Sequence, residues 1–462
     1  MNSAFSISDT IAAIATANAP GGIGIVRVSG PGSFAIAKKI FRPKKGLDWD
    51  GITGYKMAYG EVMEIDEAIC LFFRGPGSYT GEDVAELQCH GGPLLLRQVL
   101  QAALDAGARM AGPGEFTRRA VLNGRIRLNQ AEAVMRLITA QSEQALRAAH
   151  CAMGGALAER IAGVRETLIA LAAHISAWVD YPEEDISPLR DCEAEEVLSE
   201  AKEALEELTE GSRGARAVLE GVSAALVGRP NVGKSSLLNS LAGYERAIVT
   251  AMPGTTRDTV TETVQLGNLT LRLTDTAGMR ETGHPVERAG VERSVAAMRG
   301  ADLVLVVVDA VEGLMEEDEG LLAGCDPERT IVVFNKMDLL HPLSRYATAP
   351  PWGSLWSAFR TVETSAVTGK GLDALARAAE GICRTAGFVP GEAMLATQRQ
   401  AQCAADALEA VREGLWAVRG GFTPDAVSVC LEDAVQALFS LTGERASDAV
   451  VEEVFRGFCV GK

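Results

Sequence analysis

The chain has 462 residues, of which 47% are hydrophobic and 23% charged, an ordinary globular composition that excludes a disordered or fibrous protein. This length predicts about three domains. Lysine and arginine number 44 against 61 acidic residues, which gives a net charge of −17. Because phosphate-rich surfaces repel so acidic a chain, we expect poor non-specific binding to nucleic acid or membranes. Any RNA must be met at a local basic patch or with a partner's help.

The cysteines and the apolar segments predict a cytoplasmic protein without a membrane anchor. Nine cysteines are scattered without a C-x-x-C pair, which is typical of reduced thiols rather than of disulfides or a zinc site. No lysine or arginine precedes Arg27, so the basic start of a signal peptide is missing. The longest apolar run, Leu303–Val308, is too short for a membrane helix.

Residues 1–118 predict an α+β domain. The segments Gly22–Val28 and Glu67–Phe73 have the pattern of strands. The segment Pro93–Ala106 has helical periodicity, with a proline in its first turn. Pairs of glycines between these segments mark turns.

The rest of the chain predicts a helical domain interrupted by an inserted α/β domain. Helix formers dominate residues 119–218, where we expect helices over Leu128–Ala149 and Gly155–Trp178 and an acidic amphipathic helix over Glu193–Glu210. The same composition returns in residues 385–462, which end in C-x-G-K. Residues 219–384 instead alternate strands and helices. The predicted fold class is therefore α/β plus α+β.

The inserted domain carries a phosphate-binding motif. Gly228–Ser235 fits G-x-x-x-x-G-K-[ST] and follows the apolar strand Val222–Val227. Glycines let the backbone curl so that its N–H groups face phosphate oxygens at a helix N-terminus. Lys234 adds a charge for the β- and γ-phosphates, and the Ser235 hydroxyl is a ligand for Mg²⁺.

Three further motifs follow in the order that a guanine-nucleotide site requires. Asp275–Gly278 comes after a strand and is suited to a Mg²⁺ water and the γ-phosphate. Asn335–Asp338 comes after the strand Ile331–Phe334, and the Asp338 carboxylate accepts the N1–H and N2–H₂ of guanine, which adenine cannot offer in the same way. At Ser365–Ala366 a backbone N–H is placed for guanine O6. Together the motifs predict a P-loop, Ras-like GTPase domain that binds GTP.

The hydrolytic machinery departs from that of Ras-like GTPases. Met279 stands where those proteins place the glutamine that orients water, so hydrolysis must use another group or be very slow. Gly254–Asp258 is a predicted switch segment, in which Thr256 is a second hydroxyl ligand for Mg²⁺. Asn231 supplies an amide oxygen near the phosphates, and oxygens of this kind hold a monovalent cation in place of an arginine finger.

These motifs, the G-T-T-R-D switch and the terminal Cys459–Lys462 resemble the MnmE (TrmE) family of tRNA modification GTPases. The likeness covers nearly the whole chain. It includes three stretches of the N-terminal domain, Gly22–Arg27, Thr80–Gln88 and Pro113–Ala120. The nucleotide-binding motifs specify only the superclass, whereas these stretches and the C-x-G-K end specify the family.

The resemblance implies a set of site residues. For GTP it implies Asn231, Val232, Gly233, Lys234, Ser235, Ser236, Thr250, Ala251, Met252, Pro253, Gly254, Thr255, Thr256, Asp275, Thr276, Ala277, Gly278, Asn335, Lys336, Asp338, Ser365 and Ala366. For K⁺ it implies Asn231, Thr250, Met252 and Thr255. It also implies that Glu287 orients the water that attacks GTP. For a formyl-tetrahydrofolate-type donor it implies Arg27, Glu86, Lys462 and, at a position where the family has lysine, Arg125. Cys459 is a candidate redox or nucleophilic thiol.

The resemblance also implies a function and partners. With an FAD-containing partner, in a heterotetramer, a homodimer of this chain would install a carboxymethylaminomethyl-type group at C5 of the wobble uridine of certain tRNAs. The one-carbon donor would bind the N-terminal domain, to which the C-terminal tail would be delivered across the dimer. The alternative is a regulatory GTPase switch in ribosome assembly. An acidic chain fits that alternative less well, because rRNA docking calls for a basic appendage.

Overall fold

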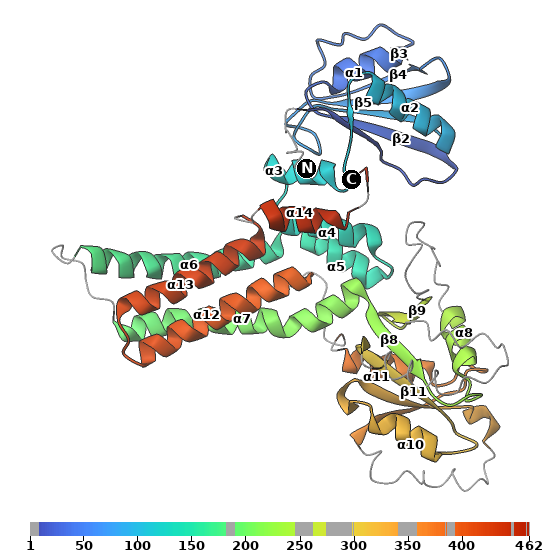
Figure 1. Cartoon of the computed structure of the whole chain (residues 1–462), viewed down its shortest axis with the longest axis vertical. Coiled ribbons are helices and arrows are strands. Elements are labelled where there is room, and N and C mark those ends of the chain that lie inside the picture. The colour runs from blue at the N-terminus through green and yellow to red at the C-terminus, as the bar shows by residue number, and fades with distance from the viewer. Residues whose placement is uncertain are drawn as a thin grey trace. The chain divides into compact units, whose positions relative to one another are not determined.

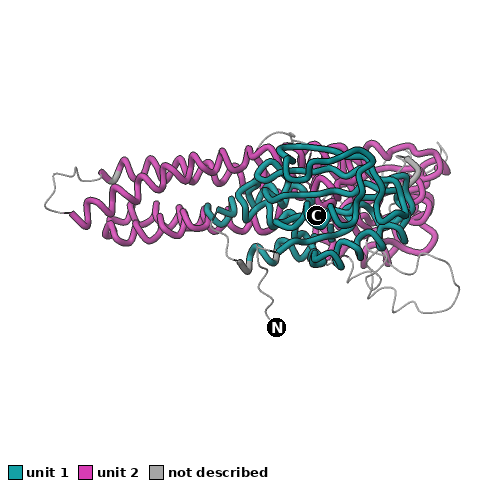
Figure 2. Tube along the Cα trace, turned by 90° about the horizontal axis from the view of Figure 1, so that it is seen from above, with its two compact units in different colours: residues 1–135, 438–462 teal, residues 136–437 magenta. Residues whose placement is uncertain are grey.

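The computed structural model describes residues 9–181, 190–244, 262–273, 298, 300–340, 358–383, 385, 393–444, 448–458 and 460–461. The chain falls into two compact units, residues 1–135 with 438–462 and residues 136–437 (Figure 2). The first unit therefore joins the two ends of the chain. In the part of the chain that the structure describes, no helix is long and apolar enough to span a bilayer.

The first unit is built on a seven-stranded sheet, blue in Figure 1, of order β3-β4-β5-β6-β2-β1-β7. Its strands are β1 (Ile11–Ile14), β2 (Gly21–Ser29), β3 (Phe41–Pro43), β4 (Tyr55–Val62), β5 (Asp66–Phe73), β6 (Val84–Gly91) and β7 (Arg109–Met110). Helices α1 (Ser33–Ile40) and α2 (Pro93–Asp105) cover one face, and alternate strand residues such as Val26, Val28 and Leu87 bury themselves beneath them. This arrangement confirms the predicted α+β domain.

Part of the other face of this sheet is covered by helix α3 (Glu115–Leu122) near β1 and by Tyr79 and Phe116 at Arg27 of β2. Helix α3 places Phe116 against Ile11 and Ala13. Helix α14 (Asp448–Arg456) joins the same unit, where Phe455 and Phe458 pack with Leu128. Over β4 and β5 this face remains exposed, with Tyr55 at 73% and Met57 at 65% exposure.

Long helices form the first part of the second unit. They are α5 (Glu143–Met153), α6 (Ala156–Asp180), α7 (Asp191–Glu220) and α12 (Gln398–Arg419), while α4 (Leu128–Thr139) and α13 (Pro424–Thr442) cross the division between units. Helix α7 lies beside α12 and α6 (Figure 1). Its buried residues recur at alternating spacings of four and three, as helix-on-helix packing requires: Ala194, Leu198, Ala201, Leu205 and Leu208.

The inserted domain has a six-stranded sheet of order β13-β12-β11-β8-β10-β9, parallel except at the β9 edge. Its elements are β8 (Val222–Val227), α8 (Lys234–Tyr244), β9 (Glu262–Leu266), β10 (Leu269–Leu273), β11 (Leu303–Asp309), α10 (Glu316–Ala323), β12 (Thr330–Asn335), β13 (Arg360–Glu363) and α11 (Leu372–Ile382), with 3₁₀ turns at Pro327–Arg329 and Met337–Leu339. Strand β11 is buried on both faces, because α8 and α11 cover one side and α10 the other. This is the predicted α/β domain.

One predicted helix was wrong. Leu128–Ala149 is not one continuous helix but forms α4 and α5, since residues 140–142 are not helical. The Ser142 hydroxyl accepts a hydrogen bond from the Ala145 N–H and so caps a new helix. The acidic helix is also longer than predicted and runs to Glu220, directly before β8.

Candidate functional sites

The P-loop follows β8 and turns into α8, as its motif requires. Gly228 has φ +146°, and a Cβ there would lie 2.3 Å from the Val307 carbonyl oxygen. Gly233 has φ +97°, and a Cβ there would lie 2.3 Å from Asn335 Nδ2. Only glycine fits either position. The loop therefore passes close to β11 and β12 and leads into the N-terminus of α8, where helix amides attract a phosphate.

Lys234 is the lysine of the P-loop motif, which is predicted to contact the phosphates. Its half-buried ammonium donates to the carbonyl oxygens of Gly228 (2.8 Å) and Arg229 (2.6 Å). Burial lowers the pKa of Lys234, and the nearby Asp318 charge offsets this only in part. A phosphate would supply the negative charge that these neutral oxygens do not. Asn231 of the loop and Ser235 and Ser236 in the first turn of α8 are exposed.

The P-loop is anchored from behind by an arginine. Arg229 Nε donates to Asp318 Oδ2 of α10 at 2.9 Å, and Arg229 Nη1 lies 3.1 Å from the exposed Glu312. Asp318 is fully buried and also accepts a hydrogen bond from the Met315 N–H. Sequence reasoning missed this pair, since nothing in the motif names a partner 89 residues away.

The residues predicted to read guanine lie together. Buried Asn335 donates to the Val232 carbonyl at 3.1 Å and accepts the Ala366 N–H at 3.0 Å. The Ser365 hydroxyl donates to Asp338 Oδ1 at 2.5 Å, which orients the exposed carboxylate. The Ala366 N–H is thus already engaged by Asn335, and a guanine O6 would have to share it.

Lys336 completes this cluster. It adopts φ +66° and pairs with Asp309 at 2.7 Å, at the end of β11. The loops after β8, β11, β12 and β13 therefore meet at the carboxyl edge of the sheet, the usual position of a ligand site in an open α/β sheet.

A second candidate site lies in the N-terminal unit. Arg27 of β2 and Glu86 of β6 are opposite each other in register, with Arg27 Nε donating to Glu86 Oε1 at 2.7 Å. The Arg27 guanidinium lies 5.7 Å from the Tyr79 ring centroid and 5.5 Å from that of Phe116. Tyr79, which sequence reasoning did not single out, is 38% exposed and its hydroxyl contacts the Thr117 hydroxyl at 2.9 Å.

Arg125 contacts the loop that contains Tyr79, the residue whose ring lies against Arg27. Its Nε donates to the Ser78 carbonyl at 3.1 Å, and Ser78 precedes the Tyr79 that contacts Arg27. Two of the predicted folate residues, distant in sequence, are thus tied to adjacent residues of one loop.

The C-terminal tail also reaches this unit. Val460 forms a β-bridge with Pro113 of the same chain, and Gly461, at φ +98°, leaves 2.2 Å between a Cβ and the Ile14 carbonyl oxygen. Ile14 is next to Ala13, which lies opposite Arg27 in register. The expectation that the tail crosses the dimer to an N-terminal domain is corrected here, because it docks on the N-terminal domain of its own chain.

Several predicted residues lie outside the described part of the chain. They are Thr250, Ala251, Met252, Pro253, Gly254, Thr255, Thr256, Asp275, Thr276, Ala277, Gly278, Glu287, Cys459 and Lys462. Their roles stay predictions.

Comparisons with known proteins agree on one family. Residues 128–459 match the model of the MnmE helical domain, and residues 10–125 match that of the GTP-binding protein TrmE N-terminus. The tRNA modification GTPase MnmE of Symbiobacterium thermophilum is 44% identical over 98% of this chain and 99% of its own length. That of Thermus thermophilus is 42% identical over 99% of this chain and 100% of its own.

Among solved structures, the G domain of the T. maritima FeoB iron transporter is 29% identical and covers 35% of this chain and 98% of its own, with a TM-score of 0.25, too low to bear on the fold. The two family models and the full-length relatives suffice. The motifs that carried the resemblance and the arrangement of the domains have the same explanation: the chain belongs to the MnmE family of tRNA modification GTPases.

Proposed function

We propose that this GTPase works with a flavoprotein partner, as a heterotetramer, to install a carboxymethylaminomethyl-type group at C5 of the wobble uridine of certain tRNAs. The one-carbon unit of this group would come from a formyl-tetrahydrofolate-type donor bound to the N-terminal domain. Family membership and two separate sites, each with its own loop and charged groups, support this proposal. The cytoplasm is the compartment in which we place the reaction.

The nucleotide site supports the GTP-dependent part of the proposal. Lys234 would bind the phosphates, and Asp338 with Asn335 would select guanine. Ser235, at the start of α8, and Thr256 would hold Mg²⁺, which neutralises phosphate charge. For K⁺ the proposed ligands are Asn231, Thr250, Met252 and Thr255, with Glu287 orienting water; hydrolysis should then be faster in K⁺ than in Na⁺.

The observation that carries the one-carbon proposal is the Arg27–Glu86 pair beside Tyr79. The Arg27 and Glu86 side chains are 20% and 13% exposed, so a ligand can reach groups that the protein has largely desolvated. A carboxylate for ring nitrogens, two arginines for carboxylates and an exposed aromatic ring together suit a reduced folate. Gly461 lies against the Ile14 carbonyl of β1, and its tail neighbours Lys462 and Cys459 are the further groups that we propose for this site.

The exposed sheet face supports a homodimer. Met57, Leu71, Glu86 and Arg27 lie opposite one another across β4, β5, β6 and β2, and so share one face. The apolar part of that face is therefore continuous with the Arg27–Glu86 pair. A second copy of this chain seated on it would bury Tyr55 and Met57 and close the open side of the site.

A binding experiment tests the one-carbon proposal and separates it from a ribosome-assembly switch. The full-length protein is titrated calorimetrically with (6S)-5-formyltetrahydrofolate, a stable form of the donor. Arg27→Gln should abolish binding, whereas Arg42→Gln, which removes an exposed charge of the same domain, should leave it unchanged. Absence of binding by the unmodified protein would reject the one-carbon proposal and favour the alternative.

A further inference from the structure

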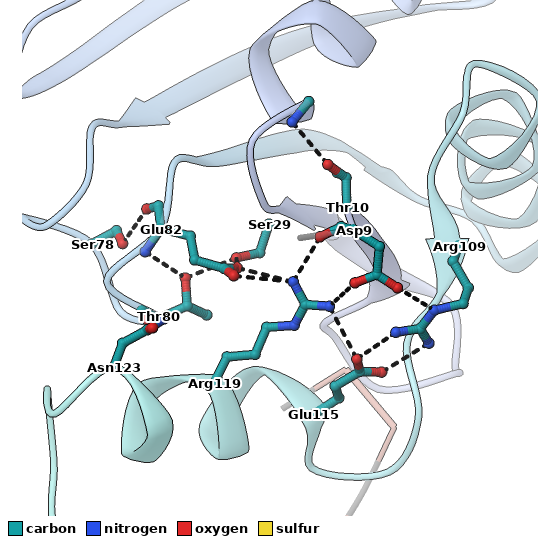
Figure 3. Close-up of polar contacts among 11 residues, drawn as sticks. Asp9, Thr10, Ser29, Ser78, Thr80, Glu82, Arg109, Glu115, Arg119 and Asn123 are labelled. Carbon is teal, nitrogen blue, oxygen red and sulfur yellow. Dashed lines mark hydrogen bonds and ion pairs between the residues drawn. The ribbon is translucent and has the colours of Figure 1, made fainter. Parts of the chain in front are cut away.

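Five charged side chains form a cluster beside the candidate one-carbon site. They are Asp9, Glu82, Arg109, Glu115 and Arg119 (Figure 3). The cluster contains one more carboxylate than guanidinium groups. It also joins two stretches that carried the family resemblance, Thr80–Gln88 and Pro113–Ala120, in which Glu86 is the residue already assigned a role.

Arg119 stands at the centre of this cluster. Its Nη1 lies 3.1 Å from Glu82 Oε1 and 2.9 Å from the Asp9 carbonyl oxygen, while its Nη2 contacts the Asp9 carboxylate and Glu115. The side chains of Arg119 and Glu82 are 4% and 11% exposed. Charges so far from water require partners of good geometry, so the position of each group restricts that of the next.

Glu82 connects this cluster to the loop Arg74–Asp83. Its Oε2 accepts the Ser29 hydroxyl at 2.7 Å, and the same hydroxyl contacts Thr80 Oγ1 at 2.8 Å (Figure 3). Its backbone carbonyl accepts the Ser78 hydroxyl. The loop is therefore held by β2 at Thr80 and Glu82 and by α3 at Glu82, while the Ser78 hydroxyl forms a hydrogen bond within the loop.

The same loop contacts both arginines of the candidate site. The Ser78 carbonyl accepts Arg125 Nε, and the Tyr79 ring lies against Arg27. Asn123 Nδ2 also donates to the loop, to the Thr80 carbonyl at 2.7 Å. A displacement of the loop would therefore move both arginines.

We propose that Glu82 and Arg119 are positioning residues of the one-carbon site, whose buried ion pair holds the loop Arg74–Asp83 so that Arg27 and Arg125 are preorganised for the donor. This inference rests on the proposed function. Neither residue needs to touch the donor. Because the ion pair already orders the loop, donor binding does not have to supply the free energy of ordering it.

Arg109→Gln is a matched control within the same cluster. Arg109 pairs with Asp9 at 2.7 Å and with Glu115 at 2.6 Å, and also donates to the Met110 carbonyl. None of these residues belongs to the loop. The variant therefore perturbs the cluster at its other end.

The test compares calorimetric binding of (6S)-5-formyltetrahydrofolate by the full-length protein and its variants. Glu82→Gln should raise the Kd by about tenfold or more, as expected when binding groups are misplaced by a fraction of an ångström. Arg109→Gln should change the Kd by less than about threefold, even where both variants lower the Tm equally. Hydrogen exchange should accelerate at residues 78–83 in Glu82→Gln alone and slow again at saturating ligand.

Asn123→Ala keeps the proposal falsifiable if Glu82→Gln does not fold. Asn123 is exposed and its loss removes one loop contact, so binding should weaken by about threefold with the Tm nearly unchanged. Unchanged affinity in the loop variants, or losses that merely follow the Tm in Arg109→Gln as well, would overturn the positioning role. Failure of the unmodified protein to bind would instead reject the proposed function.

Discussion

Asp318→Asn tests how the P-loop is held in place. Asp318 is fully buried and Arg229 is 12% exposed, so the substitution leaves a guanidinium with little access to water. Loss of one partner from a wholly buried pair costs about 3–5 kcal/mol. Glu312 remains within 3.1 Å of Arg229, and we therefore expect a loss of about 2–3 kcal/mol.

This loss should appear in nucleotide affinity. The Arg229 carbonyl accepts the Lys234 ammonium, so a displaced loop also misplaces the phosphate-binding cation. If nucleotide binding has to re-form the loop, the binding free energy falls by at most the about 2–3 kcal/mol lost with the anchor. The Kd can therefore rise by at most about 30- to 150-fold. Titration of the purified protein with a fluorescent GTP analogue should show a rise of about tenfold or more.

Glu312→Gln is the matched control. Glu312 is 55% exposed, so its removal should cost less than about 1 kcal/mol and leave the affinity almost unchanged. In a double-mutant cycle, Arg229→Met with Asp318→Asn should be less damaging than the two single losses added together, because no unpaired buried charge remains. Equal effects of Glu312→Gln and Asp318→Asn, or strict additivity, would refute this account of the anchor.

Three shorter predictions follow. Because burial lowers the pKa of Lys234, its ammonium opposes folding at neutral pH; Lys234→Met should raise the Tm of the nucleotide-free protein while abolishing GTP binding, and the Tm gap should narrow as pH rises through the lowered pKa. Burial raises the pKa of Glu115, but Arg109 and the other partners of Glu115 outweigh this and hold the pKa low. The Tm of the unmodified protein should therefore exceed that of Glu115→Gln by its full amount above about pH 4.3, and this difference should vanish as pH falls through the folded-state pKa. A difference that stays constant with pH would count against the ion pairs. Gly461→Ala should cost about 1–3 kcal/mol of tail docking against Ile14 and weaken folate binding without loss of GTP hydrolysis; equal folate affinity would show that the tail does not contribute.

The nucleotide site could be predicted from the sequence because its parts are local. Each motif directly follows a strand, and parallel strands end at one edge of a sheet. The strand Val222–Val227 was predicted with its observed bounds, and the glycines at 228 and 233 mark close backbone approaches. What the motif does not contain is the anchor, since Asp318 belongs to a helix whose acidic composition resembles an ordinary solvated face.

The N-terminal site was less accessible to sequence reasoning because its contacts are distant along the chain. Arg27 and Glu86 are 59 residues apart and meet only through the β2–β6 register. Arg119 and Asp9 are 110 residues apart. The break between α4 and α5 was missed for the opposite reason: a single capping serine, Ser142, decides it within a run of helix formers.

The two sites solve the same physical problem in the same way. A ligand-binding loop must keep the polar groups that face its ligand available, so other groups have to hold the loop in place. In the P-loop that task falls to Arg229 paired with the buried Asp318, which leaves Lys234 on neutral carbonyl oxygens. In the N-terminal unit it falls to Arg119 paired with Glu82, while Arg27 and Arg125 contact the loop at Tyr79 and Ser78. Because each anchor pair is largely buried, changes to the anchor should alter the free energy of ordering the loop rather than the chemistry of recognition. Anchor variants should therefore weaken binding of good and poor ligands by the same factor, whereas variants of the ligand-facing residues should change the ratio between them.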